Sequence, residues 1–215
     1  MKMYLSLLRK DLLIVKKYIL LTFALVIFYC IIFLSSDSVR AGVAPLAMSY
    51  LWAIYLLMQT LASSDAKYSK AEAVICATPY LRTAIVAMRY LFSLSIYFVV
   101  LIVYILMSLI INGAVLLTFA DAMFALLVGN IMLGITQPLT YKFGGEKARY
   151  IIVTLILLAT IGFQSAFFII SDEIDYSLFA NLPSVLIGGI SLILTAIIVT
   201  ISALISVSIY KKKEF

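Results

Sequence analysis

The chain has 215 residues, of which 65% are hydrophobic and only 12% are charged. Soluble domains carry roughly 45–50% apolar and 25% charged residues, so this composition excludes an ordinary water-soluble fold. The formal net charge is +6, and because the basic residues lie beside apolar runs it indicates membrane topology, not a nucleic-acid-binding surface. The chain has no histidine, which removes the commonest metal ligand and general base.

The first segment, residues 1–17, is basic and amphipathic. Leu5 and Leu8 recur at helical spacing, and Arg9 and Asp11 are interspersed with them. This pattern predicts a helix that lies in the membrane interface before the chain enters the bilayer, with a simple topological anchor as the alternative. The apolar run that follows has no small-residue cleavage pattern, so we expect a retained segment and not a cleaved signal peptide.

Apolar runs long enough to cross a bilayer recur six times. A spanning helix needs roughly 20 apolar residues, and a helix satisfies its backbone polar groups inside lipid. The predicted spans are 18–34, 42–61, 90–111, 116–137, 151–170 and 183–210. We therefore expect an all-α polytopic membrane protein with a single transmembrane domain over residues 1–215. The last span is longer than a bilayer needs, and three explanations stay open: it tilts, breaks near Gly188-Gly189, or extends beyond the membrane.

The connections between these spans divide by charge. All of the 16 Lys and Arg residues except Arg40 lie in the first segment, in the loops 62–89 and 138–150, or in the C-terminal tail. Basic loops stay in the cytoplasm during insertion, so both termini are predicted to be cytoplasmic and the protein to lie in the plasma membrane.

The loop 62–89 is the longest polar stretch and contains a proline. Ser63-Ser64-Asp65 can cap a helix start. Thr78 precedes Pro79, and a residue before proline disfavours the helical conformation. Pro79 can begin the next helix, with Arg82 one turn later. Such a helix–proline–helix element is either a rigid surface for a partner or an ordinary connection.

The sequence shows no catalytic constellation. The polar residues in the spans are mostly Ser, Thr, Asn and Gln, which form interhelical hydrogen bonds of about 0.6 kcal/mol each. A coupled carrier usually buries ionisable groups, and the one candidate, Asp121, lies near the outer end of its predicted span. Gly144-Gly145 predicts a tight turn, and no stretch matches a phosphate-binding loop.

Three predicted cytoplasmic segments carry recognisable motifs. These are Leu8-Arg9-Lys10-Asp11, the Pro-x-x-Arg element that begins at Pro79, and the Pro-x-x-Tyr-Lys-Phe-Gly-x-Glu-Lys-x-Arg element that begins at Pro138. Together with the six-span plan they resemble ABC-2 type transporter permeases over nearly the whole chain, and the third motif is the most specific. The chain departs from the family pattern at Ala77-Thr78, where Ser-Leu is frequent, at Arg89, where Lys is common, and at Gly145, where an aromatic residue is common.

The resemblance implies a half-transporter. Two permeases, identical or related, would pair with two cytoplasmic ABC ATPase subunits, and those subunits would bind ATP and Mg, so this chain would bind no cofactor and would not be an enzyme. The ATPase-coupling residues that the resemblance implies are Lys70, Glu72, Ala73, Thr78, Pro79 and Arg82. The residues it assigns to the interfacial helix are Leu5, Leu8, Arg9 and Asp11. Those in the second cytoplasmic loop are Tyr141, Lys142, Gly144, Glu146 and Arg149.

Small permeases of this branch resemble the bacterial exporters of phenol-soluble modulins and lantibiotics. The resemblance therefore implies export of amphipathic peptides or other hydrophobic compounds, which suits spans rich in Tyr, Phe and Leu. Two alternatives stay open: a gradient-driven carrier or channel, and a membrane protein that confers peptide immunity without transport.

Overall fold

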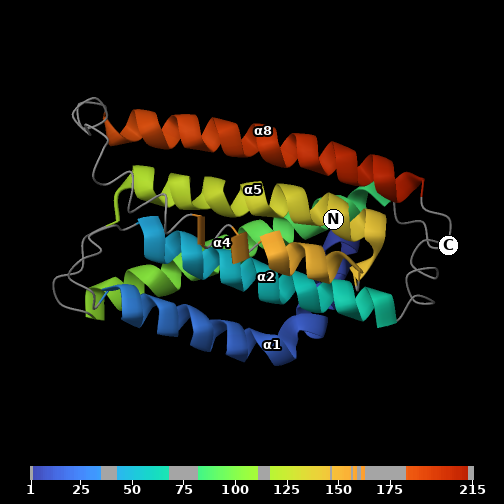
Figure 1. Cartoon of the computed structure of the whole chain (residues 1–215), viewed down its shortest axis with the longest axis horizontal. Helices are drawn as coiled ribbons and strands as arrows, with labels where there is room; N and C mark the ends of the chain where they lie inside the picture. Colours follow the sequence, from blue (N-terminus) through green and yellow to red (C-terminus); the bar gives the residue numbers. More distant parts are fainter. Residues whose placement is uncertain are drawn as a thin grey trace.

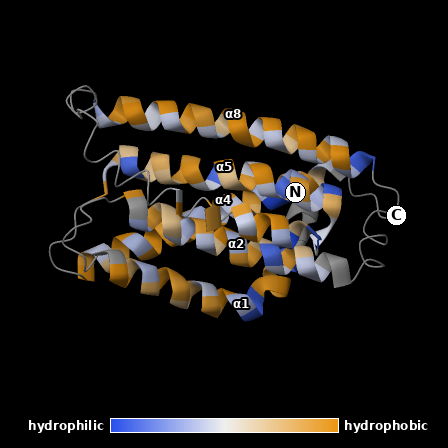
Figure 2. Ribbon diagram, in the orientation of Figure 1, coloured by the Kyte–Doolittle hydropathy of each residue, from blue (hydrophilic) through white to orange (hydrophobic). Residues whose placement is uncertain are grey.

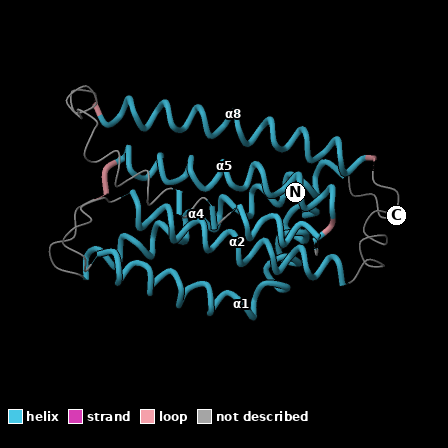
Figure 3. Tube along the Cα trace, in the orientation of Figure 1, coloured by secondary structure: helices cyan, strands magenta, loops and turns pink. Residues whose placement is uncertain are grey.

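The computed structural model describes residues 2–34, 43–67, 82–110, 117–145, 147–155, 157–158, 161–162 and 183–212, without the side chains of residues 2–8, 33–34, 44, 65–67 and 82. Within these ranges every regular element is a helix (Figure 3). The five long helices are α1 Lys2–Leu34, α2 Val43–Lys67, α4 Arg82–Ile110, α5 Phe119–Phe143 and α8 Ser184–Lys211.

Each of the five helices is long and apolar enough to cross a membrane. They lie alongside one another as a bundle (Figure 1), with α8 against α5, α5 against α2, and α2 against α1. Five of the six predicted spans therefore correspond to helices. The predicted span 151–170 lies mostly outside the described residues, although 147–155 are helical and pack on the bundle through Ala148 and Ile152.

The first predicted boundary, between an interfacial helix and a span at residue 17, falls inside one helix. α1 is continuous from Lys2 to Leu34. Figure 1 shows that the N-terminal part of α1 turns away from the direction of the rest of the helix. Its apolar window runs over Arg9–Ile32, so the candidate span begins earlier than predicted.

The loop 62–89 is shorter than predicted at both ends. α2 continues to Lys67, so the prediction that Ser63-Ser64-Asp65 caps a new helix was wrong. The Ser63 hydroxyl instead donates to the carbonyl oxygen of Thr60, at 3.0 Å, within the same helix. α4 starts at Arg82 and not at residue 90, because no helix breaker separates Arg82 from the span.

The fourth span also ends later than predicted. α5 starts at Phe119 and continues through Pro138 to Phe143, whereas the sequence predicted a loop from Pro138 onward. Proline has no N–H to donate to the Gly134 carbonyl oxygen. It is tolerated here because the Ser202 hydroxyl of α8 donates to that oxygen instead. The helix ends at Gly144, whose φ of 79° is a conformation that glycine adopts without strain, which confirms the predicted turn.

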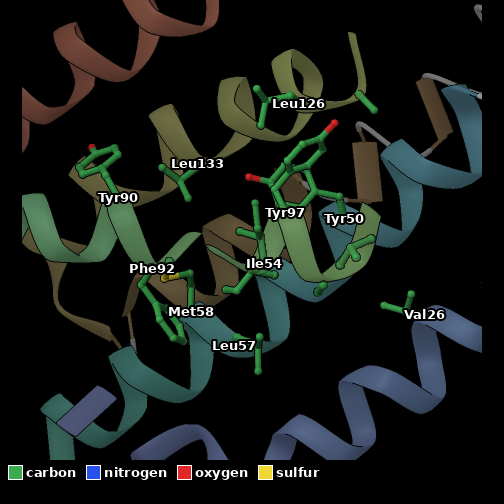
Figure 4. Packing of buried hydrophobic residues seen from close by; sticks show 14 of the residues in the cluster. Val26, Tyr50, Ile54, Leu57, Met58, Tyr90, Phe92, Tyr97, Leu126 and Leu133 are labelled. Carbon is green, nitrogen blue, oxygen red and sulfur yellow. The ribbon is translucent and has the colours of Figure 1, made fainter. Parts of the chain in front are cut away.

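The centre of the bundle is aromatic. Tyr50 of α2 and Tyr97 of α4 are fully buried, and their rings meet edge to face with centroids 5.0 Å apart (Figure 4). A Cβ atom on Gly129 of α5 would overlap the Tyr50 ring, so only glycine lets α5 approach α2 this closely. The Tyr97 hydroxyl donates to the carbonyl oxygen of Ala122, at 2.6 Å, which ties α4 to α5.

The last helix, α8, packs through small and polar residues. It passes through Gly188-Gly189 without a break, which removes one of the three explanations for its length. Its buried residues lie on one face, at spacings of three, four or seven positions: Gly188, Ser191, Thr195, Ser202, Ser206 and Tyr210. Small residues along such a stripe permit close helix contact in lipid. The remaining surface of α8 is strongly hydrophobic, as Figure 2 shows.

Candidate functional site: the basic end of the bundle

One end of the bundle gathers the ends of four helices. α2, α5 and α8 finish there and α4 begins there (Figure 1). We call it the basic end, because the exposed cations Lys142, Arg149, Lys211 and Lys212 belong to it. Figure 2 shows hydrophilic residues at this end of α8.

The opposite end carries an acidic side chain with a local role. The Asp121 carboxylate accepts hydrogen bonds from the backbone N–H and the hydroxyl of Thr118, at 3.0 and 2.6 Å. The Thr118 hydroxyl oxygen in turn accepts from the Asp121 N–H, which completes a capping box at the start of α5. Asp121 is therefore accounted for as a helix cap.

Among the described residues, one cation is buried, Arg89, which lies about two turns into α4. Its side chain is only 6% exposed, and its guanidinium carbon lies 6.0 Å from the centre of the Tyr141 ring on α5. Tyr141 in turn packs edge to face on Tyr210 of α8, with centroids 5.3 Å apart. A buried arginine with an aromatic neighbour joins three helices at this end, and an ionisable group at such a depth is a functional-site candidate.

A chain of hydroxyl groups joins the same three helices through Tyr90, the residue after Arg89. The Ser202 hydroxyl donates to the carbonyl oxygen of Gly134, at 2.8 Å, so its proton is used. Tyr90 lies 2.6 Å from that Ser202 oxygen and must therefore be its donor. Ser206 lies 3.1 Å from the Tyr90 oxygen and supplies the next proton. The order Ser206, Tyr90, Ser202 and Gly134 fixes the direction of every bond.

A small cavity lies between α2, α4 and α5. It has a volume of about 30 Å³ and is lined by Arg89, Gln137 and Met58, among others. The Gln137 amide nitrogen donates to the Met58 sulfur at 3.3 Å, and its carbonyl oxygen, although buried, has no hydrogen-bond partner among the described residues. A cavity of this size can hold one water molecule, which would serve that oxygen.

The turn after α5 is pressed against the end of α2. A Cβ atom on Gly145 would overlap the carbonyl oxygen of Ala62 on α2, so this position accepts only glycine without a shift. Beyond the turn, the Ala148 N–H donates to the Gly144 carbonyl oxygen at 3.0 Å, and Ala148 is fully buried. The second loop is thereby fixed beside the helix that leads into the predicted coupling loop.

The structure describes only some of the predicted site residues. Six of them lie outside the described residues: Lys70, Glu72, Ala73, Thr78, Pro79 and Glu146. The side chains of three more are not described either, those of Leu5, Leu8 and Arg82. Arg9 is exposed, whereas Asp11 is only 5% exposed, with the Lys10 ammonium 3.6 Å from its carboxylate. Tyr141 is buried against Arg89, while Lys142 and Arg149 are exposed.

Sequence reasoning missed Arg89, Tyr90 and Gln137 as members of one site. Arg89 was counted with the loop charges, and Gln137 with the ordinary polar residues of the spans. Nothing in their local sequence signals that they converge, since their partners lie on α2, α5 and α8.

A family model described as ABC-2 family transporter protein matches residues 6–211. The chain belongs to the ABC-2 transporter family. No curated protein and no solved structure matched it. ABC-2 permeases are membrane transport subunits that associate with ABC ATPases and are not themselves catalytic.

In this ABC-2 protein, the basic end contains the second connection that the family motifs marked, together with the two helix ends that flank residues 68–81. The connection 68–81 joins the end of α2 to the start of α4, and Gly144-Gly145 lies against the end of α2. Arg89 follows the first residue of α4 by about two helical turns. The described motif residues Tyr141, Gly144 and Arg149 thus lie at the same end as the buried arginine.

Proposed function

We propose that this protein is the membrane subunit of an ATP-driven exporter, with its basic end in the cytoplasm, where a separate ATPase docks. Family membership over residues 6–211 supports the ATPase partnership. Exposed cations at one end of the bundle support the orientation, because basic loops are retained in the cytoplasm.

The observation that carries the proposal is the rigid connection from the predicted coupling loop into the bundle. That loop enters α4 at Arg82, and Arg89 and Tyr90 follow within about two turns. These two side chains contact α5 and α8 through Tyr141, Ser202 and Ser206. A push on the start of α4 therefore moves three interlocked helices and not one.

The proposed cargo is an amphipathic peptide or another hydrophobic compound, passing between this subunit and a second permease. α1, α4 and α8 expose many large apolar side chains outside the described core, among them Leu20, Ile110 and Val185. A space between two such surfaces would be apolar, which favours this cargo over sugars or ions.

A charge-reversal experiment tests the coupling assignment. Arg82→Glu and Glu72→Lys are compared with Lys212→Glu, which reverses an exposed charge at the same end. We expect both loop variants to lose co-purifying ATPase and ATP-dependent uptake of a labelled amphipathic peptide into inverted vesicles, while membrane insertion and the control are unchanged. Wild-type ATPase recovery from both loop variants would sink the assignment.

A gradient-driven carrier is the second candidate, and buried ionisable groups favour it. Arg89 and Asp11 are 6% and 5% exposed, which is the kind of burial that proton- or ion-coupled carriers use. Transport into ATP-free vesicles under an imposed ion gradient would establish this alternative. Absence of transport under the gradient, with transport restored by ATP and the ATPase, would exclude it.

A further inference from the structure

A long apolar groove runs between α1 and α4, with one residue of α2, Leu57, in its lining. Its volume is about 200 Å³. On α1 it is lined by one helix face, on which Leu12, Val15 and Ile19 are spaced three and four residues apart. In Figure 4, Leu57 and Phe92 lie on the side of the buried cluster that faces α1.

The groove lies within two candidate spans, so its contents are hydrocarbon or protein. Only two hydroxyl groups line it, those of Thr22 and Ser95. Both donate to backbone carbonyl oxygens one turn earlier, Tyr18 and Leu91, at 2.8 and 3.0 Å. The groove therefore has no unused donor for a polar ligand, and it matches an unbranched alkyl chain.

Two cations flank one end of this groove. Arg9 and Lys16 are exposed, and they lie three residues before and four residues after Leu12, so they are its neighbours on the surface of α1. The ion pair at this part of α1 joins Lys10 to Asp11 and includes neither of them. An anionic group placed at the mouth of the groove would meet both positive charges.

We propose that the groove binds an anionic phospholipid, with an acyl chain along α1 and α4 and the phosphate held by Arg9 and Lys16. A helix from a second protomer could also fill the apolar part, but it would give the two cations no partner. An anionic lipid would fill the apolar groove with its acyl chain and pair its phosphate with the two cations. The proposal does not depend on ATP-driven export, since a carrier or an immunity protein would have the same groove.

Tryptophan quenching by brominated lipids measures this binding directly. Trp52 is the single tryptophan, so Trp52→Phe removes the native signal, and Phe23→Trp places a reporter in the groove lining. The full chain is reconstituted in phosphatidylcholine vesicles that contain increasing fractions of dibrominated phosphatidylglycerol. A parallel series uses dibrominated phosphatidylcholine.

We expect half-maximal quenching at a lower mole fraction of the brominated phosphatidylglycerol. Each surface cation contributes about fivefold to the binding of an anionic lipid, so Arg9→Gln with Lys16→Gln removes a preference of up to roughly 25-fold. Lys17→Gln is the matched control, because its helical neighbours Leu13, Leu20 and Leu21 do not line the groove. Val99→Phe, which fills the groove, reduces quenching by both lipids.

Three results would overturn the proposal. The first is equal half-quenching by the two lipids in the reporter protein. The second is a phosphatidylglycerol preference that survives the double substitution. The third is no quenching by either lipid, which would mean that protein covers the groove. Circular dichroism and gel filtration of each variant establish that the quenching is compared between folded proteins.

Discussion

The Ser202 hydroxyl of α8 donates to the carbonyl oxygen of Gly134 on α5, at 2.8 Å. Gly134 is four residues before Pro138, so this carbonyl is the one that a proline leaves without its helical donor. In lipid no water is available to replace that donor. A side chain of α8 therefore supplies the hydrogen bond that the backbone of α5 lacks at Pro138, and α5 continues to Phe143.

This relationship predicts a coupling between positions 202 and 138. Ser202→Ala leaves the Gly134 carbonyl without its side-chain donor and the Tyr90 hydroxyl without its acceptor, and we expect a loss of about 1 kcal/mol in the free energy of unfolding. In a Pro138→Ala background the loss is smaller, since the new backbone N–H serves Gly134. Unfolding in mixed micelles, followed by circular dichroism, measures both.

The control for this cycle is Ser208→Ala, which removes an exposed hydroxyl from the same helix. It should leave stability nearly unchanged. An equal cost of Ser202→Ala in both backgrounds would contradict the account of Pro138.

The contact between Gly145 and Ala62 predicts a strong preference for glycine. Gly145→Ala places a methyl group against the Ala62 carbonyl oxygen, and we expect a loss of about 1–3 kcal/mol as the turn moves away from α2. Gly189→Ala is the matched control, because nothing lies within 4 Å of its added Cβ and alanine favours a helix. Thermal unfolding compares the two. A Gly145→Ala protein as stable as the control would show that the turn is not packed on α2.

Arg89 is expected to transmit ATPase action through its charge and its contact with the Tyr141 ring. Arg89→Gln should reduce stimulated ATP hydrolysis in the reconstituted complex by more than about tenfold, and Arg89→Lys, which keeps the cation but not the planar group, should reduce it less. Lys212→Gln removes an exposed charge from the same end and serves as the control. Full stimulation in the Arg89→Gln complex would limit Arg89 to a structural role.

Orientation is predicted from the charge difference between the two ends. In a chain with Cys30→Ala and Cys76→Ala, we compare Pro183→Cys with Lys212→Cys, since both positions are exposed at opposite ends of α8. A membrane-impermeant maleimide added to intact cells should label position 183 only, and position 212 should react after permeabilisation. Labelling of position 212 in intact cells would reverse the orientation.

Hydropathy alone located the long helices, because the hydrocarbon core requires long apolar runs. Helix ends were harder to predict, since they depend on distant partners. The end of α5 depends on Ser202, which no local pattern around Pro138 reveals. The cap at Thr118 and Asp121 is different, because a Thr-x-x-Asp spacing is a local signal that was available in the sequence.

The candidate site was predictable in its location but not in its members. Charge distribution and motifs indicated the end at which the loops meet. The burial of Arg89 depends on α5 and α8, where Tyr141 and Tyr210 form the aromatic contact, and the sequence gives no register between these helices. Arg89 therefore looked like one more charge in a loop.

The proposed function requires that a separate ATPase binds this protein. Affinity purification of the tagged chain from its own cells in mild detergent, with every co-purifying chain identified, tests it most directly. We expect to recover a stoichiometric soluble chain that carries a phosphate-binding loop, together with a second permease copy or relative. Recovery of the protein without any ATPase, under conditions that keep known ABC complexes intact, would contradict it.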